Sequence, residues 1–518
     1  MKNLLFAIST SAICLTTLGY DRVTVDMDFV SDLAQQKAQA EYAEDAPELP
    51  PALQQLTYDN YRNIRFRNSE ALWIGQDYDF VVEFFHLGYI YHDPVLVYET
   101  TDTHLQQVPF SRSFFNYDDS SMMPYEAPDN IGFAGVRIRY PLNMPQVRDD
   151  LIVFQGASYF RALGKGNSYG LSARGLGQGI GQENEKFPHF TRIWLKKPTE
   201  ANAESLTVYA LLEGETVTGA YEFTLTPGDE TNVVVRSRIY PRSEAERLCF
   251  APLTSMYYFG ENSEFPVDDW RPEVHDSDGL LIANSKEWLW RPIQNPTKIQ
   301  HQSFPVDKLR GFGLLQRDRR FTSYEDLEAN YERRPSVWIT PEGKWPAGSV
   351  TLVEMPTPNE TEDNINAYWV PSEPPAVGQF YELNYRMTWR SSEPNRAVAN
   401  VVETRIGQKT LDPDATSFAI EFTPPKGFEV DKLGEYSVAF ESDGAPVKTE
   451  PQLRYNKAEN CVRAYFDLSR NTTASHHLSL TLLQNNQPVS ETWAYLWKPF
   501  KANEHVSSNQ RTHFSQNQ

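Results

Sequence analysis

Two acidic segments set among aromatic residues have the composition expected of a catalytic site. The first, residues 268–279, contains five carboxylic acids and His275, and Trp288, Trp290 and Arg291 follow it closely. Glycoside hydrolysis requires such surroundings, because one carboxyl group must stay protonated to assist the leaving oxygen while another is ionised to activate water. The flat aromatic rings nearby would suit the C–H faces of sugars.

The second acidic segment, residues 359–364, precedes Tyr368 and Trp369. Glu362 is adjacent to Asp363, and like-charge repulsion would raise the proton affinity of Asp363 if both side chains were partly buried. Taken alone, either segment is more often a solvated acidic loop than a catalytic one. The catalytic hypothesis therefore needs support from the rest of the chain.

Other motifs with known chemistry fail on their context. Residues 166–170 match the G-x-S-x-G pattern, but that nucleophile elbow requires a following helix, and residues 171–181 contain four glycines. The same run fails the dinucleotide fingerprint, because Ile180 stands where the third glycine should be. We therefore expect no nicotinamide or flavin cofactor.

Metal-binding patterns are equally incomplete. Residues 276–279 resemble part of a calcium loop, yet Val274 and Ser285 occupy the first and twelfth ligand positions, where carboxylates are needed. The ten histidines include no His-Glu-x-x-His spacing. We therefore expect neither a calcium loop nor a catalytic zinc, and no metal.

Composition restricts the class of protein. The chain has 48 Lys and Arg against 69 Asp and Glu, a net charge of -21, which is the wrong sign for binding nucleic acid or an anionic membrane surface. It contains 29 Phe, 27 Tyr, 11 Trp and 35 Pro, a mixture that favours a β-rich protein.

The N-terminus resembles a secretory signal. Lys2 supplies a positive charge, residues 4–18 are apolar, and Gly19 is a small residue of the kind found at cleavage sites. Ile13 precedes Cys14, where a lipoprotein would need a small residue. We predict a Sec-type signal peptide over residues 1–19, export to the periplasm and a soluble mature chain.

The mature chain begins with a helical pattern and then becomes β-rich. Apolar residues recur with a period near 3.6 over residues 28–42, which predicts an amphipathic helix that packs on the main body. Period-two alternation dominates after Phe66, and residues 221–226 and 232–240 form a predicted hairpin. A second short helical stretch is expected at residues 323–333.

A change of composition predicts a domain boundary. Residues 391–396 are turn-forming and lack an apolar anchor, so we predict a large β-sandwich over residues 20–390 and a smaller, immunoglobulin-like sandwich over residues 397–500. Residues 501–518 are polar and are predicted to form a disordered tail. Cys249 and Cys461 would survive processing, and two unpaired thiols are favoured over a bridge between them.

Longer segments resemble the periplasmic glucan biosynthesis protein G and D family over essentially the whole mature chain. The resemblance is carried by residues 156–161, 169–176, 251–256, 271–277 and 311–317. It implies an all-β fold in which a large galactose-mutarotase-like sandwich precedes an immunoglobulin-like domain. It also implies a role in making osmoregulated periplasmic glucans, whose β-1,2-linked backbone some family members cleave with inversion.

The resemblance implies two catalytic aspartates. By local motif the acid falls on Asp363 and the base on Asp276, with Asp278 as the alternative base. Glu362 departs from the family pattern and leaves the working pH of the acid open. Candidate sugar-binding residues near the acidic segments, each of which is individually more often a core residue, are Trp270, Arg271, Trp288, Trp290, Trp345, Tyr368 and Trp369.

The lack of a twin-arginine pair near Met1 makes the chain more similar to the G branch. Three hypotheses stay open: an inverting β-1,2-glucanase, a non-catalytic glucan-binding factor that cooperates with a membrane glucosyltransferase, and a branching transglycosylase.

Overall fold

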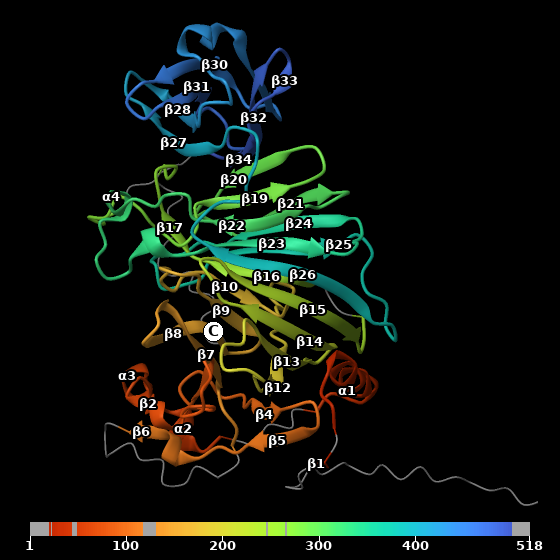
Figure 1. The fold of residues 1–518 in the computed structure, drawn as a ribbon. Helices are drawn as coiled ribbons and strands as arrows, with labels where there is room; N and C mark the ends of the chain where they lie inside the picture. Colours follow the sequence, from red (N-terminus) through yellow and green to blue (C-terminus); the bar gives the residue numbers. More distant parts are fainter. Residues whose placement is uncertain are drawn as a thin grey trace, which may run out of the picture.

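The computed structural model describes residues 20–21, 23–43, 49–117, 131–244, 247–264 and 267–499. The fold is the predicted all-β sandwich, built from several sheets (Figure 1). The predicted signal peptide, residues 1–19, and the predicted tail, residues 501–518, lie outside the described residues. Among the described helices, none is long and apolar enough to cross a membrane.

The first large sheet runs through both parts of the chain. Its sixteen strands, in spatial order with β33 beside β32, are β1 (Tyr20–Asp21), β5 (His104–Val108), β4 (Leu96–Thr100), β12 (His189–Lys196), β13 (Leu206–Glu213), β14 (Val217–Thr226), β15 (Thr231–Pro241), β26 (Tyr381–Arg390), β23 (Ser336–Glu342), β22 (Gly311–Leu315), β19 (Gly279–Ala283), β20 (Trp288–Pro292), β34 (Thr492–Trp497), β32 (His476–Gln484), β29 (Tyr436–Ser442) and β33 (Gln487–Pro488).

The second large sheet has ten strands and packs on the first. In order, with β11 paired to β16, they are β21 (Gln300–Val306), β24 (Gly348–Glu354), β25 (Ile365–Pro371), β16 (Leu248–Ser255), β10 (Ser172–Arg174), β9 (Tyr159–Ala162), β8 (Val147–Gln155), β7 (Gly135–Met144), β3 (Val81–Phe85) and β11 (Leu176–Gln178).

Smaller sheets and short helices complete the described fold. The sheets are β17 (Tyr257–Phe259) with β18 (Val274–His275), β2 (Ile64–Phe66) with β6 (Phe115–Tyr117), and the four strands β27 (Val401–Lys409), β28 (Asp412–Phe422), β31 (Cys461–Ser469) and β30 (Val447–Asn456). The α-helices are α1 (Met27–Gln39), α2 (Pro51–Gln54), α3 (Tyr58–Tyr61) and α4 (Phe321–Tyr324), and the 3-10 helices are η1 (Asn68–Glu70), η2 (Arg112–Phe114), η4 (Tyr331–Arg333) and η5 (Val430–Glu435).

Aromatic packing between the two large sheets forms the main core. The ring of Phe223, from the sixteen-stranded sheet, lies 5.1 Å from that of Phe154 and 5.3 Å from that of Phe160, both in the ten-stranded sheet. All three side chains are buried. Alternation along each strand turns every second residue to this core, which leaves the other face of the ten-stranded sheet free to carry polar groups.

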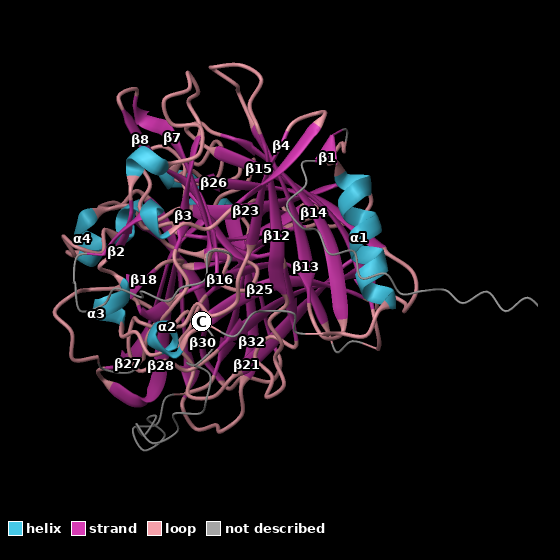
Figure 2. Cartoon of the chain, turned by 90° about the horizontal axis from the view of Figure 1, so that it is seen from below, coloured by secondary structure: helices cyan, strands magenta, loops and turns pink. Residues whose placement is uncertain are grey.

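Helix α1 confirms the predicted amphipathic helix. The Asp26 side chain accepts a 2.8 Å hydrogen bond from the Phe29 N–H and so caps its first turn. Val30 and Ala34 are buried in a cluster with Trp194 of β12, and the helix covers β13 and β14 (Figures 1 and 2). The helix thus covers the outer face of the sixteen-stranded sheet.

The predicted hairpin is present, but the second predicted helical stretch is not a single helix. Strands β14 and β15 are antiparallel neighbours, as expected. Residues 323–333 do not form one helix: α4 ends at Tyr324 and η4 begins at Tyr331. Glu325 at the end of α4 and Asn330 before η4 both have positive φ, which interrupts the helical path.

The C-terminal part is joined to the large sandwich by more than its linker. Strand β26 ends at Arg390 and β27 begins at Val401, so residues 391–396 lie in the connection. Strand β34 pairs in parallel with β20 and extends the sixteen-stranded sheet across both parts. The buried Glu491 carboxylate accepts hydrogen bonds from Arg317 at 2.8 Å and from Arg396 at 3.0 Å.

Both cysteines of the described chain are buried and unpaired, as favoured. Burial raises the pKa of the Cys249 thiol to about 12, so this thiol stays protonated and unreactive at neutral pH.

Candidate active site

The end of β16 holds the first acidic segment in place. Asp276 directly follows β18, and its backbone N–H donates to the Met256 carbonyl at 2.8 Å. The hydroxyls of Ser277 and Ser255, the last residue of β16, lie 2.9 Å apart. The Asp276 side chain is consequently fixed in a buried position.

Asp363 is fixed to the same place by its neighbour. It lies between β24 and β25, and Asn364 donates its side-chain amide to the Tyr257 carbonyl at 3.0 Å and the Met355 carbonyl at 2.8 Å. The Tyr257 N–H in turn donates to the Asn364 side-chain oxygen at 2.9 Å. The two aspartate loops, 87 residues apart in the chain (363 minus 276), are thereby joined through residues 256 and 257.

Asp276 has a cationic partner that the sequence did not reveal. Its carboxylate accepts a hydrogen bond from the Arg334 guanidinium. The pKa of Asp276 is raised above its usual range, because burial outweighs the lowering by Arg334 and the charge of Asp363 adds to the rise. The two carboxyl groups therefore lie within electrostatic reach of each other, and Arg334 favours the ionised form of Asp276.

Asp363 is more accessible. Its side chain is 27% exposed, and its Oδ2 lies 3.7 Å from the Arg161 Nη2. Glu362 is exposed, so the condition for the predicted like-charge effect on Asp363 is not met, because solvent screens an exposed charge.

Arg334 is held by a tyrosine next to the acidic loops. Its guanidinium carbon lies 4.2 Å from the centre of the Tyr331 ring, and the Tyr331 hydroxyl donates to Glu360 at 2.7 Å. Arg271 also donates to Glu360 at 2.7 Å. The ring of Trp270 is 71% exposed beside this network, which leaves it available to a ligand.

Four of the candidate aromatic residues are packed into the protein. Trp369 is fully buried between the large sheets, its ring 5.5 Å from that of Trp345, and Tyr368 is fully buried against Cys249. Trp290 is buried under the Arg317 guanidinium at 3.4 Å, in the core shared with the C-terminal part. Trp369, Tyr368 and Trp290 therefore present no free ring face in this structure.

Trp288 is also separated from the aspartates. It lies in the same shared cluster, with the Arg310 guanidinium carbon 4.9 Å from its ring. The structure thus brings Asp276, Asp363, Trp270 and Arg271 to one region and places the other aromatic candidates in the cores.

A group of tyrosines near Arg161 was not predicted. The rings of Tyr61 and Tyr91 lie 5.6 Å apart, and those of Tyr61 and Tyr89 6.1 Å apart. Burial raises the pKa of the Tyr91 phenol, and the Arg161 charge lowers it, which places Tyr91 near Arg161. The closely spaced tyrosines at positions 58, 61, 89 and 91 were the available signal.

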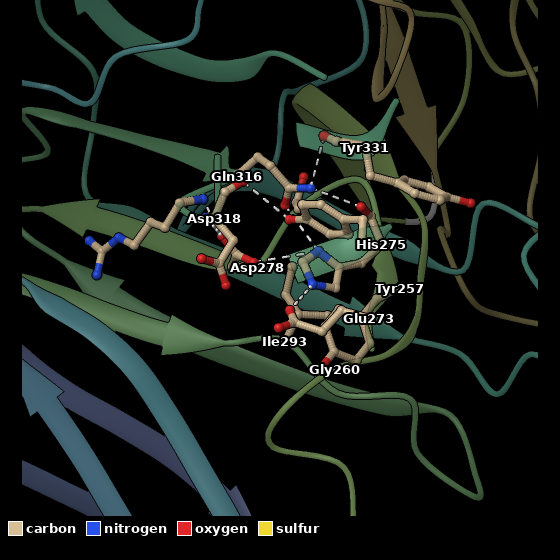
Figure 3. Close-up of polar contacts among 12 residues, drawn as sticks. Tyr257, Gly260, Glu273, His275, Asp278, Ile293, Gln316, Asp318 and Tyr331 are labelled. Carbon is tan, nitrogen blue, oxygen red and sulfur yellow. Dashed lines mark hydrogen bonds and ion pairs between the residues drawn. The ribbon is translucent and has the colours of Figure 1, made fainter. Parts of the chain in front are cut away.

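Asp278, the alternative base, belongs to a separate cluster. Its Oδ2 accepts backbone hydrogen bonds from Arg317 and Asp318, and its Oδ1 lies 3.4 Å from His275 Nδ1. Figure 3 shows His275 between Glu273, Asp278 and Gln316. The geometry therefore favours Asp276 over Asp278 as the partner of Asp363.

The atoms of Glu273, His275 and Asp278 lie close enough together to hold a metal ion. The Gln316 amide donates to the His275 and Tyr331 carbonyls, so its oxygen faces His275 Nδ1 at 3.0 Å (Figure 3). His275 Nε2 faces Glu273 at 2.8 Å. Both ring nitrogens face acceptors, and a doubly protonated imidazole has no lone pair for a metal.

The charges around His275 agree with this protonation state. Burial lowers its pKa, but the carboxylates of Asp278 and Glu273 outweigh burial and raise the pKa to about 10. The cluster is therefore an ion-pair network.

The fold and this site define an all-β protein with two converging acidic loops beside a polar sheet face. The family model described as "Periplasmic glucan biosynthesis protein, MdoG" matches residues 25–497, and the chain belongs to that family. Glucans biosynthesis protein G of Ralstonia nicotianae is 39% identical over 91% of this chain and 95% of its own.

Of two further relatives, one is named as a protein G and the other as a protein D. Glucans biosynthesis protein G of Bradyrhizobium diazoefficiens is 40% identical over 92% of this chain and 94% of its own. The probable glucans biosynthesis protein D of Shewanella oneidensis is 39% identical over 90% and 88%. The family resemblance is thus confirmed, and family membership supports involvement in periplasmic glucan biosynthesis.

Proposed function

We propose that this protein is a periplasmic glycoside hydrolase that cleaves the β-1,2-linked backbone of glucan with inversion. The observation that supports this function most directly is the joining of the Asp276 and Asp363 loops through Asn364 and Tyr257. Two carboxyl groups held at one place can divide the roles of acid and base, whereas solvated acidic loops would have no such link.

Asp276 is the proposed general base. A base must take up a proton from water. Burial raises the pKa of Asp276, which strengthens it as a base, and the hydrogen bond from Arg334 limits that rise. Because Arg334 also packs on Tyr331, the carboxylate is held in one orientation from which it activates water directly or through a short water chain.

Asp363 is the proposed general acid. Its partial exposure allows it to reach a glycosidic oxygen, and a bound glucan would remove water from its surroundings and favour the protonated form. Arg161 is its ion-pair partner in the free chain. Its own side chain is 45% exposed, so glucan hydroxyls can engage it and weaken its pairing with Asp363.

Incubation of the purified mature chain with linear β-1,2-glucan, followed by mass spectrometry, tests the proposal. Short oligosaccharides are expected from the parent. Asp363→Asn should lower cleavage by a factor on the order of 100 or more while glucan binding persists. Glu362→Gln is the matched control, since it removes an exposed neighbouring charge, and it should cleave at a rate close to that of the parent.

The same incubation identifies the alternative functions. Binding without any change in the polymer would replace the hydrolase with a glucan-binding factor, which would then cooperate with a membrane glucosyltransferase. Longer or branched products would indicate transglycosylation.

A periplasmic extract should contain a chain that starts close to Tyr20, as cleavage of the signal peptide near Gly19 requires.

A further inference from the structure

A pocket lies near the candidate active site without being lined by either of its aspartates. Its volume is about 410 Å³, within the range of small-molecule sites. It is lined by the β8–β9 turn at residues 155–157, by residues 185–190 and by Tyr91. Asp276 and Asp363 are not among its lining residues, so it is separate from the proposed chemistry.

A buried donor in this pocket lacks a partner. The Gln178 side chain is 1% exposed, and its oxygen accepts a 2.8 Å hydrogen bond from the Thr216 hydroxyl. That bond orients the Gln178 Nε2, which has no hydrogen-bond partner among the described residues. Buried donors are normally satisfied, so this amide is suited to an acceptor oxygen on a ligand.

The charged residues that line the pocket have polar partners. Glu185 accepts from Arg174 at 2.7 Å, and Lys186 donates to Glu215 at 2.5 Å. His189 Nδ1 lies 3.5 Å from the Asp93 Oδ2. An uncharged polar ligand would leave these contacts undisturbed.

The apolar part of the lining is aromatic. Tyr91, Phe187 and Phe190 contribute rings beside the polar groups. Polar donors and acceptors together with rings suit a pyranose, which has hydroxyls around its edge and C–H groups on its faces. The turn that forms one wall is strained: Ala157 has a φ of 41°, and its carbonyl accepts from the Phe190 N–H at 3.0 Å. Such strain is typical of ligand sites.

Arg174 and Tyr159 lie between this pocket and Asp363. The Arg174 guanidinium carbon lies 4.5 Å from the Tyr159 ring on one side and 5.1 Å from the Phe187 ring on the other. Burial raises the pKa of Tyr159 to about 12, and the charges of Glu185 and Asp363 both raise it. Tyr159 therefore lies between the pocket, to which Glu185 belongs, and Asp363.

We propose that this pocket binds a glucosyl unit of the glucan chain at a distance from the bond that is cleaved. The inference rests on the proposed function for the identity of the sugar. The role of the pocket is to hold the polymer. It would therefore increase the affinity for long chains and leave the affinity for the shortest substrates unchanged.

Calorimetry with β-1,2-linked glucan fragments of increasing length tests the pocket in the Asp363→Asn background. Gln178→Glu keeps an acceptor for Thr216 but replaces the unpartnered donor with a carboxylate. Long fragments should bind three- to tenfold more weakly, and short fragments should bind unchanged. Gln379→Glu, the same change at an exposed position, is the matched control and should bind like its background.

A second measurement covers the case in which Gln178→Glu fails to fold, as a melting curve would reveal. Crystals soaked with the β-1,2-linked glucose disaccharide should show density in the pocket, with a sugar oxygen near Gln178 Nε2. Absence of that density, or equal affinities of Gln178→Glu and Gln379→Glu for long fragments, would overturn the proposal. Density without glucan cleavage by the parent would instead reject the hydrolase and keep the pocket.

Discussion

The side chain of Asn364 bonds both backbone groups of Tyr257, accepting from its N–H at 2.9 Å and donating to its carbonyl at 3.0 Å. Asn364 adjoins Asp363, and Tyr257 follows the residue whose carbonyl accepts the Asp276 N–H. One amide therefore fixes the relative positions of the two candidate catalytic residues.

Asn364→Asp should decouple the two loops. The substituted carboxylate keeps an acceptor for the Tyr257 N–H but cannot donate to the carbonyls of Tyr257 and Met355, which lose their partner. We expect a loss of stability of about 1–3 kcal/mol and a fall in glucan cleavage larger than the fall in binding. Denaturant unfolding and initial rates measure the two effects, and unchanged cleavage would contradict the positioning role.

Asp276→Asn and Asp278→Asn should separate the two candidate bases. Asp276→Asn should reduce cleavage by a factor on the order of 100 or more, because an amide cannot accept the proton of water. Asp278→Asn should lower stability through the His275 cluster and leave cleavage within about tenfold of the parent. The cleavage rates of the two variants are to be compared at a temperature below both of their melting temperatures. A larger loss of cleavage in Asp278→Asn than in Asp276→Asn would assign the base to Asp278.

Asp318→Asn should stabilise the protein above neutral pH. Burial and the carboxylates of Asp278 and Glu273 raise the pKa of Asp318 to about 7. The folded state therefore retains a proton that the unfolded chain releases near pH 4, so stability falls as pH rises from about 4 to 7. At pH 8 the variant should gain on the order of 1 kcal/mol. Urea unfolding at pH 5 and pH 8 measures this, and an equal effect at both would contradict it.

Trp270→Ala should weaken glucan binding with little effect on folding. The side chain is 71% exposed, so its removal costs little packing. The fluorescence change on adding β-1,2-glucan, which should not occur with β-1,4-glucan, should be reduced in the variant. Trp369→Phe is the contrasting change, because it alters a fully buried ring and should lower stability before it affects binding.

Local sequence was enough for the elements that depend on periodicity. The alternation in residues 221–240 and the 3.6-residue period before Tyr42 correctly predict β14, β15 and α1. These patterns are short-range, because each strand or helix must turn its own apolar residues to a core. Family resemblance added the candidate acid and base, Asp363 and Asp276.

Only the tertiary structure decided what surrounds those aspartates. Arg334 and Arg161 reach Asp276 and Asp363 from sequence separations of 58 and 202 residues (334 minus 276, 363 minus 161), which no local pattern encodes. Likewise the sequence groups Trp288, Trp290 and Trp369 with the acidic segments. In the structure their rings pack into the cores instead, because the face of a strand that is buried depends on which sheets pack against it.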